Sequence, residues 1–184
     1  YLKYYDLAKH FNPDFQRSLL IGGAAYSYPK YYLKKFPEAS IDVVEIDPEL
    51  TKLAREHFRL SDDPRLKIIH EDGRTFLNNC NEKYDIVFVD AFKSQYTLPY
   101  QLTTREAVQK IYNILNNDGI AILNIISSID GKKSLFLQAE YLTYQSVFQQ
   151  VYLFVIHNMD DKEQLQSVVL VALKSDKIPG FNSS

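Results

Sequence analysis

Short apolar runs recur along the chain, separated by segments in which apolar residues return at helical spacing. The runs have about the length of buried strands (roughly 4–8 residues), and several are rich in valine and isoleucine, which favour strands. The pattern predicts strands over Ser18 to Ile21, Ile41 to Glu45, Leu66 to His70, Tyr84 to Val89, Ile120 to Ile126, Tyr152 to His157 and Gln166 to Leu173.

Capping residues between the strands mark where helices begin. Asp47 can accept from the free N–H groups of a first helical turn, and Pro48 suits the first helical position. Thr103 and Glu106 form a capping box at the start of another helix. The predicted helices are Tyr28 to Phe36, Pro48 to about Phe58, a short helix from Asp72-Gly73 to near Asn78, about Thr104 to Leu115, and Lys132 to Gln149.

The order of these elements predicts the fold class. Strands that alternate with helices form right-handed crossovers and a mostly parallel sheet. The last two predicted strands are separated only by Asn158 to Gln164, which has the length of a hairpin loop, so the last strand is expected to be antiparallel. We therefore predict an α/β, Rossmann-like class I methyltransferase fold, with a seven-stranded, mostly parallel sheet and helices on both faces. One domain covers residues 1–175, with a helical lead-in at 1–17 and a frayed tail at 176–184.

The composition fits one ordinary globular domain and excludes several classes of partner. A chain of 184 residues suits a single core, and a net charge of -2 gives no attraction to nucleic acid. No apolar run approaches the roughly 20 residues of a membrane helix, so the chain itself is not expected to span a membrane. The single cysteine, Cys80, forms no intramolecular disulfide and no metal cluster, and the reducing cytoplasm is the expected compartment. Because the chain begins at Tyr1, we expect a missing N-terminal segment.

Ligands of open α/β sheets bind beyond the carboxyl ends of the strands, so the residues that end each predicted strand form the candidate site. Gly22 and Gly23 end the first strand, where they either let a ligand approach the backbone or only make a tight turn. Glu45 ends the second strand, the place where an acidic side chain accepts from both ribose hydroxyls of a nucleoside. A solvated strand end is the alternative, and the position in the βαβ unit favours the ribose.

Two further carboxylates follow the third and fourth predicted strands. Asp72, with Gly73 after it, can accept from the amino group of adenine, cap the short helix, or do both. Asp90 closes the apolar strand YDIVFVD. It is a candidate general base or anchor for a substrate amine, and the alternative is a structural or capping carboxylate.

Several stretches together resemble one family: IGG, VVEIDPEL, DPRLKIIHEDGRTFL, YDIVFVDAF and LTTREAVQKIYNILNNDGIAILNI. They are similar to the spermidine synthase-like (polyamine aminopropyltransferase) superfamily, from about Leu19 to about Ile126. The resemblance implies a metal-free transferase that uses decarboxylated S-adenosylmethionine, or S-adenosylmethionine, on a small amine, and it implies a homodimer. The implied roles are the donor's tail at Gly22-Gly23, the ribose at Glu45, the adenine at Asp72 and Gly73, and the base at Asp90.

The chain also departs from that family. The family loop Gly-Gly-Gly-Asp-Gly-Gly is replaced by Gly22 to Ser27 (GGAAYS), so Ala25 stands where an acidic residue holds the donor amine. Lys93 replaces the second carboxylate of the family's Asp-Ser-Ser-Asp motif, and a cation there repels a cationic polyamine. Three hypotheses follow: an aminopropyltransferase-like enzyme, an S-adenosylmethionine-dependent methyltransferase, and a non-catalytic domain that binds a nucleoside or a protein.

Overall fold

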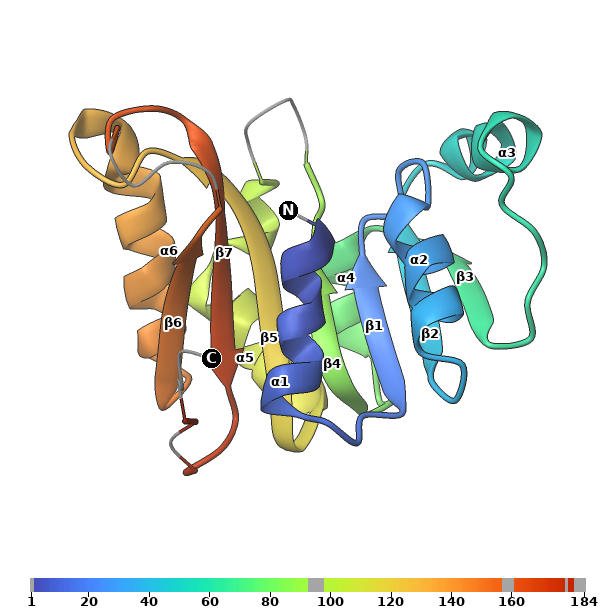
Figure 1. The fold of residues 1–184 in the computed structure, drawn as a ribbon, viewed down its shortest axis with the longest axis horizontal. Helices are drawn as coiled ribbons and strands as arrows, with labels where there is room; N and C mark the ends of the chain where they lie inside the picture. Colours follow the sequence, from blue (N-terminus) through green and yellow to red (C-terminus); the bar gives the residue numbers. More distant parts are fainter. Residues whose placement is uncertain (1, 93–97, 157–160, 178, 181–184) are drawn as a thin grey trace.

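The computed structural model describes residues 2–92, 98–156, 161–177 and 179–180. Its seven-stranded sheet has the order β3-β2-β1-β4-β5-β7-β6, and only β7 runs against its neighbours (Figure 1). The predicted mostly parallel sheet with an antiparallel last strand is therefore confirmed. The strands are β1 (Arg17–Ile21), β2 (Ser40–Glu45), β3 (Leu66–His70), β4 (Tyr84–Val89), β5 (Leu115–Ser127), β6 (Gln150–Val155) and β7 (Gln166–Leu173).

Helices cover both faces of the sheet, as predicted. One buried layer includes side chains of α1, α2 and α3, such as Ala8, Tyr32 and Ala54. The other includes Leu77 of α4 and Val108 of α5, together with side chains of α6. In Figure 1, α1 and α2 lie in front of the strands and α4 and α5 behind them. The helices are α1 (Leu7–Phe11), α2 (Ser27–Lys35), α3 (Pro48–His57), α4 (Gly73–Asn79), α5 (Arg105–Ile114) and α6 (Leu135–Gln145), with 3-10 turns at Leu2–Asp6, Tyr100–Leu102 and Lys132–Ser134.

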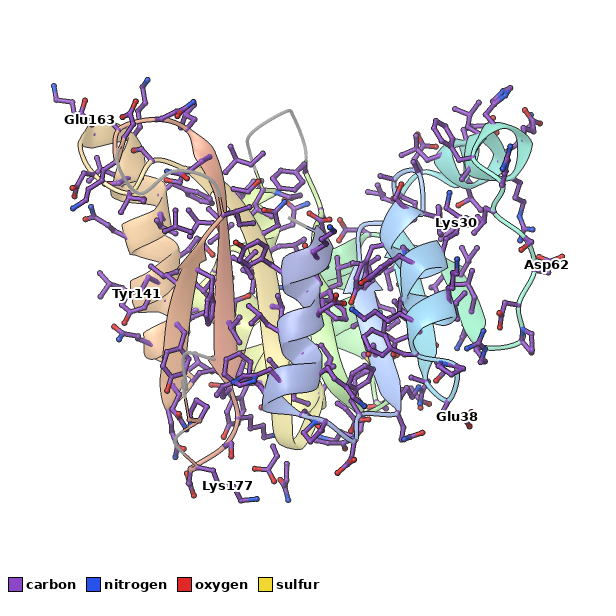
Figure 2. All side chains as sticks on the ribbon, in the orientation of Figure 1. Lys30, Glu38, Asp62, Tyr141, Glu163 and Lys177 are labelled. Carbon is purple, nitrogen blue, oxygen red and sulfur yellow. The ribbon has the colours of Figure 1, made fainter. Side chains whose placement is uncertain are left out.

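Alternation along the strands sends side chains to both layers. In β1, Leu19 and Ile21 join the α4–α6 layer, and Leu20 joins the α1–α3 layer. Charged side chains such as those of Glu38, Asp62 and Lys177 point outward from the ribbon (Figure 2). The sheet is thus buried on both faces, which is why its strands read as nearly continuous apolar runs.

Several predicted boundaries are wrong, among them the start of β6, which is Gln150 and not Tyr152. The cap of α5 is Thr104, whose Oγ1 accepts from the Ala107 N–H at 3.3 Å, and not Thr103. The long helix predicted over Lys132 to Gln149 is a 3-10 turn followed by α6, which ends at Gln145. Strand β5 is predicted to begin at Ile120 but begins at Leu115. The turn residues before Ile120 remain within the strand, and the pairing with β4 shifts register between Tyr84 and Ile86 to accommodate them.

Some predictions fall on residues that are not described. His157, predicted to end the sixth strand, and residues 158–160 of the predicted hairpin loop lie outside the described residues. The same holds for Lys93 and for residues 178 and 181–184 of the predicted tail. A transmembrane span would need a longer and more apolar helix than any that the structure describes.

A buried carboxyl group lies on α6. The side chain of Glu140 is 3% exposed, and its Oε2 has no hydrogen-bond partner among the described residues. Burial raises the pKa of Glu140 from 4.5 to about 8. The folded state therefore binds this proton more tightly than the unfolded state, so the group's contribution to stability is complete below about pH 4.5 and is lost as the pH rises to about 8.

Glu140→Gln is accordingly expected to increase the free energy of unfolding by on the order of 3 kcal/mol at pH 7, with little effect near pH 4. Urea unfolding at several pH values measures this, with the exposed Glu163→Gln as the control. An equal gain at pH 4 and pH 8 would mean that ionisation of Glu140 is not the cause.

Candidate functional site

The turn after β1 begins with a glycine that no other residue could replace without strain. Gly22 has φ +102°, and a Cβ there would lie 2.6 Å from the carbonyl oxygen of Asp90. Its N–H donates to the Val44 carbonyl at 2.8 Å, while the Asp90 N–H donates to the Ile21 carbonyl at 2.9 Å. Gly22 therefore brings the carboxyl ends of β1, β2 and β4 into direct contact.

The rest of the turn is held in an unusual conformation. The Tyr26 N–H donates to the Gly23 carbonyl at 2.8 Å, and the non-glycine residues Ala24 and Tyr26 have φ values of 46° and 55°. Left-handed non-glycine residues cost on the order of 1–3 kcal/mol each unless their surroundings fix them. Glu45 and the Tyr26 side chain itself supply such surroundings.

Glu45 is buried against the turn, with an exposed fraction of 5%. Its Oε2 accepts from the N–H groups of Gly23 at 2.8 Å and Ala24 at 2.9 Å, and its Oε1 accepts from the Asp47 N–H at 3.0 Å. A carboxylate offers about four lone-pair sites, so about one remains for a ligand. The alternative of a solvated strand end is wrong, whereas the ribose role stays a prediction. In this conformation Glu45 can accept from only one ribose hydroxyl.

Tyr26 was not singled out from the sequence as a site residue. Its side chain is fully buried, and the ring lies so close to Gly23 that a Cβ there would be 2.8 Å from Cζ. The Tyr26 hydroxyl bonds Thr51 Oγ1 at 2.7 Å, and Thr51 Oγ1 bonds His70 Nε2 at 2.9 Å. Burial raises the pKa of Tyr26, so the phenol stays protonated. The sequence did contain a signal for this role, because Tyr26 is an aromatic residue at a position where the family loop has glycine.

Asp72 and Gly73 approach the same edge from α4. Asp72 Oδ1 accepts from the Thr75 N–H at 2.9 Å, so the predicted capping role is confirmed. Its Oδ2 accepts from Gln101 Nε2 at 3.4 Å, a long contact that leaves room for an adenine amino group. Partial burial acts to raise the pKa of Asp72, but hydrogen bonds from Thr75 and Gln101 outweigh it and lower the pKa. At Gly73 a Cβ would lie 2.7 Å from Ile21 Cγ2, so this glycine packs α4 against the end of β1.

In the conformation of the turn described here, these residues can make some of the contacts that a nucleoside needs. Ile46, directly after Glu45, is 66% exposed and offers an apolar surface to a base. Glu45 can take one ribose hydroxyl, and Asp72 can take the amino group of the base. Within the described residues no three His, Cys, Asp or Glu side chains gather as a metal site would require.

Asp90 lies at the end of β4, next to the glycine turn. Its Oδ1 accepts from Nδ2 of Asn124 on β5 at 3.2 Å. Asn124 is 2% exposed and was not singled out from the sequence, where it reads only as one polar residue in the apolar run AILNII. Lys93, which the resemblance sets beside Asp90, lies outside the described residues.

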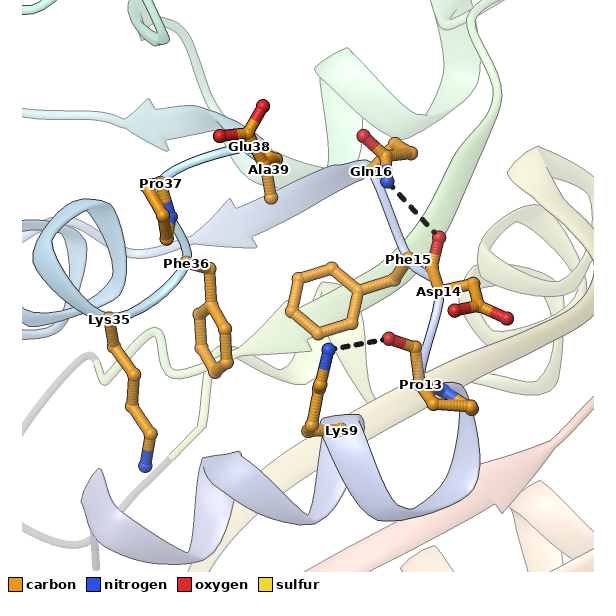
Figure 3. A pocket seen from close by; sticks show the side chains of 10 residues that line it. All are labelled: Lys9, Pro13, Asp14, Phe15, Gln16, Lys35, Phe36, Pro37, Glu38 and Ala39. Atoms are coloured by element: carbon orange, nitrogen blue, oxygen red, sulfur yellow. Dashed lines mark hydrogen bonds between the residues drawn. The ribbon is translucent and has the colours of Figure 1, made fainter.

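A cleft of about 410 Å³ lies at the opposite edge of the sheet, between α1 and α2 (Figure 3). Phe15 and Phe36 form apolar walls, and Lys9 Nζ on α1 donates to the Pro13 carbonyl at 2.7 Å. This cleft lies at the amino ends of β1 and β2, so it is separate from the residues predicted to bind a nucleoside.

Glu45→Ala is expected to weaken the binding of methylthioadenosine or S-adenosylmethionine by about 1.5–3 kcal/mol, roughly 10- to 150-fold, because a charge-assisted hydrogen bond is lost. Calorimetric titration measures this. Glu49→Ala, at an exposed position on α3, is the matched control. Unchanged affinity in a folded Glu45→Ala protein would remove Glu45 from the ribose site.

Comparison with known proteins gives a match over most of the chain. Residues 6–160 match the spermine/spermidine synthase domain. A polyamine aminopropyltransferase of Vibrio vulnificus is 32% identical over 149 residues, which cover 79% of this chain and 48% of that protein. The chain thus spans about half the length of this relative.

Solved structures show the same fold. A probable spermidine synthase from Corynebacterium glutamicum has a TM-score of 0.78 at 24% identity, covering 89% of this chain and 57% of that one. Human methyltransferase-like protein 13, solved in complex with SAH, has a TM-score of 0.75 at 23% identity, covering 92% of this chain and 78% of that one. The predicted methyltransferase-type fold is confirmed by these similarities.

Proposed function

The chain belongs to the spermine/spermidine synthase family, and from this we propose that it is a transferase that moves an alkyl group from an S-adenosylmethionine-type donor to a small amine. One observation carries the proposal. The glycine turn contacts two carboxylate-bearing residues at once, because Gly23 donates to the Glu45 carboxylate and Gly22 packs against the backbone of Asp90. Only the glycine turn would therefore separate a nucleoside held at Glu45 from the candidate base, Asp90.

In the proposed reaction the donor supplies a carbon bonded to a positively charged sulfur. Glu45, Ile46 and Asp72 hold its nucleoside part. The Asp90 carboxylate accepts a proton from the acceptor ammonium group, and the freed nitrogen lone pair forms a bond to the donor carbon. The electron pair of the broken C–S bond goes to sulfur, which becomes a neutral thioether. The proton on Asp90 then passes to water.

The preferred donor is decarboxylated S-adenosylmethionine, since the similar protein of Vibrio vulnificus is a polyamine aminopropyltransferase. A methyltransferase is the second candidate, and Ala25 favours it. An acidic residue at that place in the loop would attract the donor's amine and repel a donor carboxylate. With Ala25 there, this repulsion is missing, which suits S-adenosylmethionine with its carboxylate intact. The proposed compartment is the cytoplasm.

Calorimetric titration with methylthioadenosine, S-adenosylmethionine and its decarboxylated form tests the proposal. We expect at least one of them to bind. The donor that binds more tightly and reacts with putrescine then shows whether the protein transfers an aminopropyl or a methyl group. A folded protein that binds none of the three would contradict the proposal and favour the non-catalytic hypothesis.

A further inference from the structure

The glycine turn ends in an aromatic residue whose backbone is strained. Tyr26 directly precedes α2 with φ 55° and ψ 29°, in the left-handed region that favours glycine. The resemblance to the spermidine synthase family places a glycine at this position of the loop. A tyrosine is stable here only if the contacts of its side chain offset the strain of its backbone.

The Tyr26 side chain is anchored by a hydrogen-bond chain that crosses three elements. Its hydroxyl bonds Oγ1 of Thr51 on α3 at 2.7 Å, and this Oγ1 bonds Nε2 of His70, the last residue of β3, at 2.9 Å. Tyr26 and Thr51 are buried, whereas His70 is exposed. The hydrogen-bond chain therefore leads from beneath the glycine turn to the surface at the carboxyl end of β3.

The number of hydrogens available sets the direction of the hydrogen-bond chain. Because the phenol of Tyr26 stays protonated, it can donate to Thr51, which has one hydrogen to donate in turn. Both hydroxyls find an acceptor when Nε2 of His70 carries no hydrogen. With a hydrogen on Nε2, one hydroxyl hydrogen would have no acceptor among these three side chains, which is unfavourable in a buried position. His70 is therefore needed as the final acceptor.

The two ends of the hydrogen-bond chain lie at the two places predicted to hold a nucleoside. At one end, the turn that Tyr26 closes donates two backbone N–H groups to the carboxylate of Glu45. At the other end, His70 is the partner of Glu45 in the pairing of β2 with β3, and it precedes Asp72 by two residues. The turn beside the predicted ribose site is thus connected with the strand that leads to the predicted adenine site.

We infer that Tyr26, Thr51 and His70 are positioning residues, which hold the ribose and adenine carboxylates at the separation that an adenosine group requires. This inference rests on the proposed function, since it assumes a nucleoside between Glu45 and Asp72. The candidate base lies at the end of β4, across β1 from β2 and β3. The hydrogen-bond chain is therefore expected to set the affinity for the donor and not the rate of transfer.

The first test is Tyr26→Phe, which keeps the ring against Gly23 and removes only the hydroxyl. Its affinity for methylthioadenosine, measured by calorimetric titration, is expected to fall about three- to tenfold, because the turn loses its anchor. The KM for the preferred donor should rise by the same factor, with kcat within about twofold of the wild type. Unchanged affinity in a folded Tyr26→Phe protein overturns the inference.

Tyr32→Phe is the matched control. It removes the hydroxyl of another fully buried tyrosine from the helix that Tyr26 precedes. That hydroxyl bonds Ser18 Oγ at 2.9 Å and the Ser40 carbonyl at 3.1 Å, at the amino ends of β1 and β2. Tyr32→Phe is expected to lower the stability and to leave the affinity for methylthioadenosine unchanged. An equal loss of affinity in this control would show a general effect of destabilisation and would overturn the inference.

Two variants of His70 test the exposed end of the hydrogen-bond chain and cover the case in which Tyr26→Phe does not fold. His70→Leu removes the acceptor of the Thr51 hydroxyl and is expected to weaken methylthioadenosine binding as much as Tyr26→Phe does. His70→Gln offers an amide oxygen in place of Nε2 and is expected to bind within about twofold of the wild type. Equal losses in the two variants, or no loss in His70→Leu, overturn the inference.

These outcomes are distinguishable from a failure of the proposed function. If the wild type binds none of methylthioadenosine, S-adenosylmethionine and its decarboxylated form, the proposed function fails and the inference fails with it. If the wild type binds methylthioadenosine and both Tyr26→Phe and His70→Leu bind it as tightly, only the inference fails.

Discussion

Asp90→Asn is expected to abolish amine transfer and to leave nucleoside binding intact. The asparagine has the same shape as Asp90 but cannot accept a proton, so the acceptor amine stays charged and its nitrogen has no lone pair with which to attack. Positioned bases contribute about 10²- to 10⁴-fold to rate, so a loss of that size in kcat is predicted. Product formation from the preferred donor and amine measures it, beside titration of the donor.

The control for this variant is Asp62→Asn, which changes an exposed carboxylate that pairs with Arg55. It should retain full activity. Near wild-type kcat in Asp90→Asn would remove Asp90 as the base. Loss of donor binding in the same variant would instead mean that Asp90 acts by holding the turn around Gly22.

The fold could be predicted because its signals are local. The apolar strand β2 and the cap formed by Asp47, which accepts from the Glu49 N–H at 2.9 Å, follow from neighbouring residues in the sequence. Where two local signals compete, prediction failed. Thr103 and Thr104 are both good caps, but the Thr103 hydroxyl donates to the Tyr100 carbonyl at 2.9 Å and Thr104 caps α5.

The site was predicted less completely, because its contacts join distant parts of the chain. Position at a strand end made Glu45 and Asp90 candidate site residues, which they remain, yet it did not reveal that Glu45 already accepts three backbone hydrogen bonds. The ring of Tyr26 against Gly23 and the amide of Asn124 against Asp90 depend on tertiary packing. Neither follows from spacing in the sequence.

The glycine pair illustrates the difference between the two kinds of argument. From the sequence, Gly22 and Gly23 admit either a ligand or a tight turn. In the structure their lack of a side chain is first required by the protein itself, by the backbone of Asp90 at Gly22 and by the ring of Tyr26 at Gly23. The conformation of Gly22 and Gly23 is therefore fixed by packing within the protein, and a donor that binds beside them contacts a surface that is already formed.

Gly22→Ala is consequently expected to lower the free energy of unfolding by on the order of 3–5 kcal/mol. Two costs add: a φ of +102° strains any residue with a side chain, and the new Cβ would lie 2.6 Å from the Asp90 carbonyl oxygen and 2.9 Å from Ala91 Cα. Both contacts are to backbone, which cannot rotate away as a side chain can. Since a domain is stable by only about 5–15 kcal/mol, the variant should unfold at a much lower urea concentration.

The matched control is Gly180→Ala, where an added Cβ meets nothing within 4 Å and stability should not change. Gly23→Ala should be intermediate, because the clashing atom, 2.8 Å away, belongs to the Tyr26 side chain. Relief of that clash by Tyr26→Ala in the double variant would show that the cost at Gly23 comes from the ring. Wild-type stability in Gly22→Ala would mean that β1 and β4 do not approach each other at this turn, and the contact between the glycine turn and Asp90 that supports the proposed function would be lost with it.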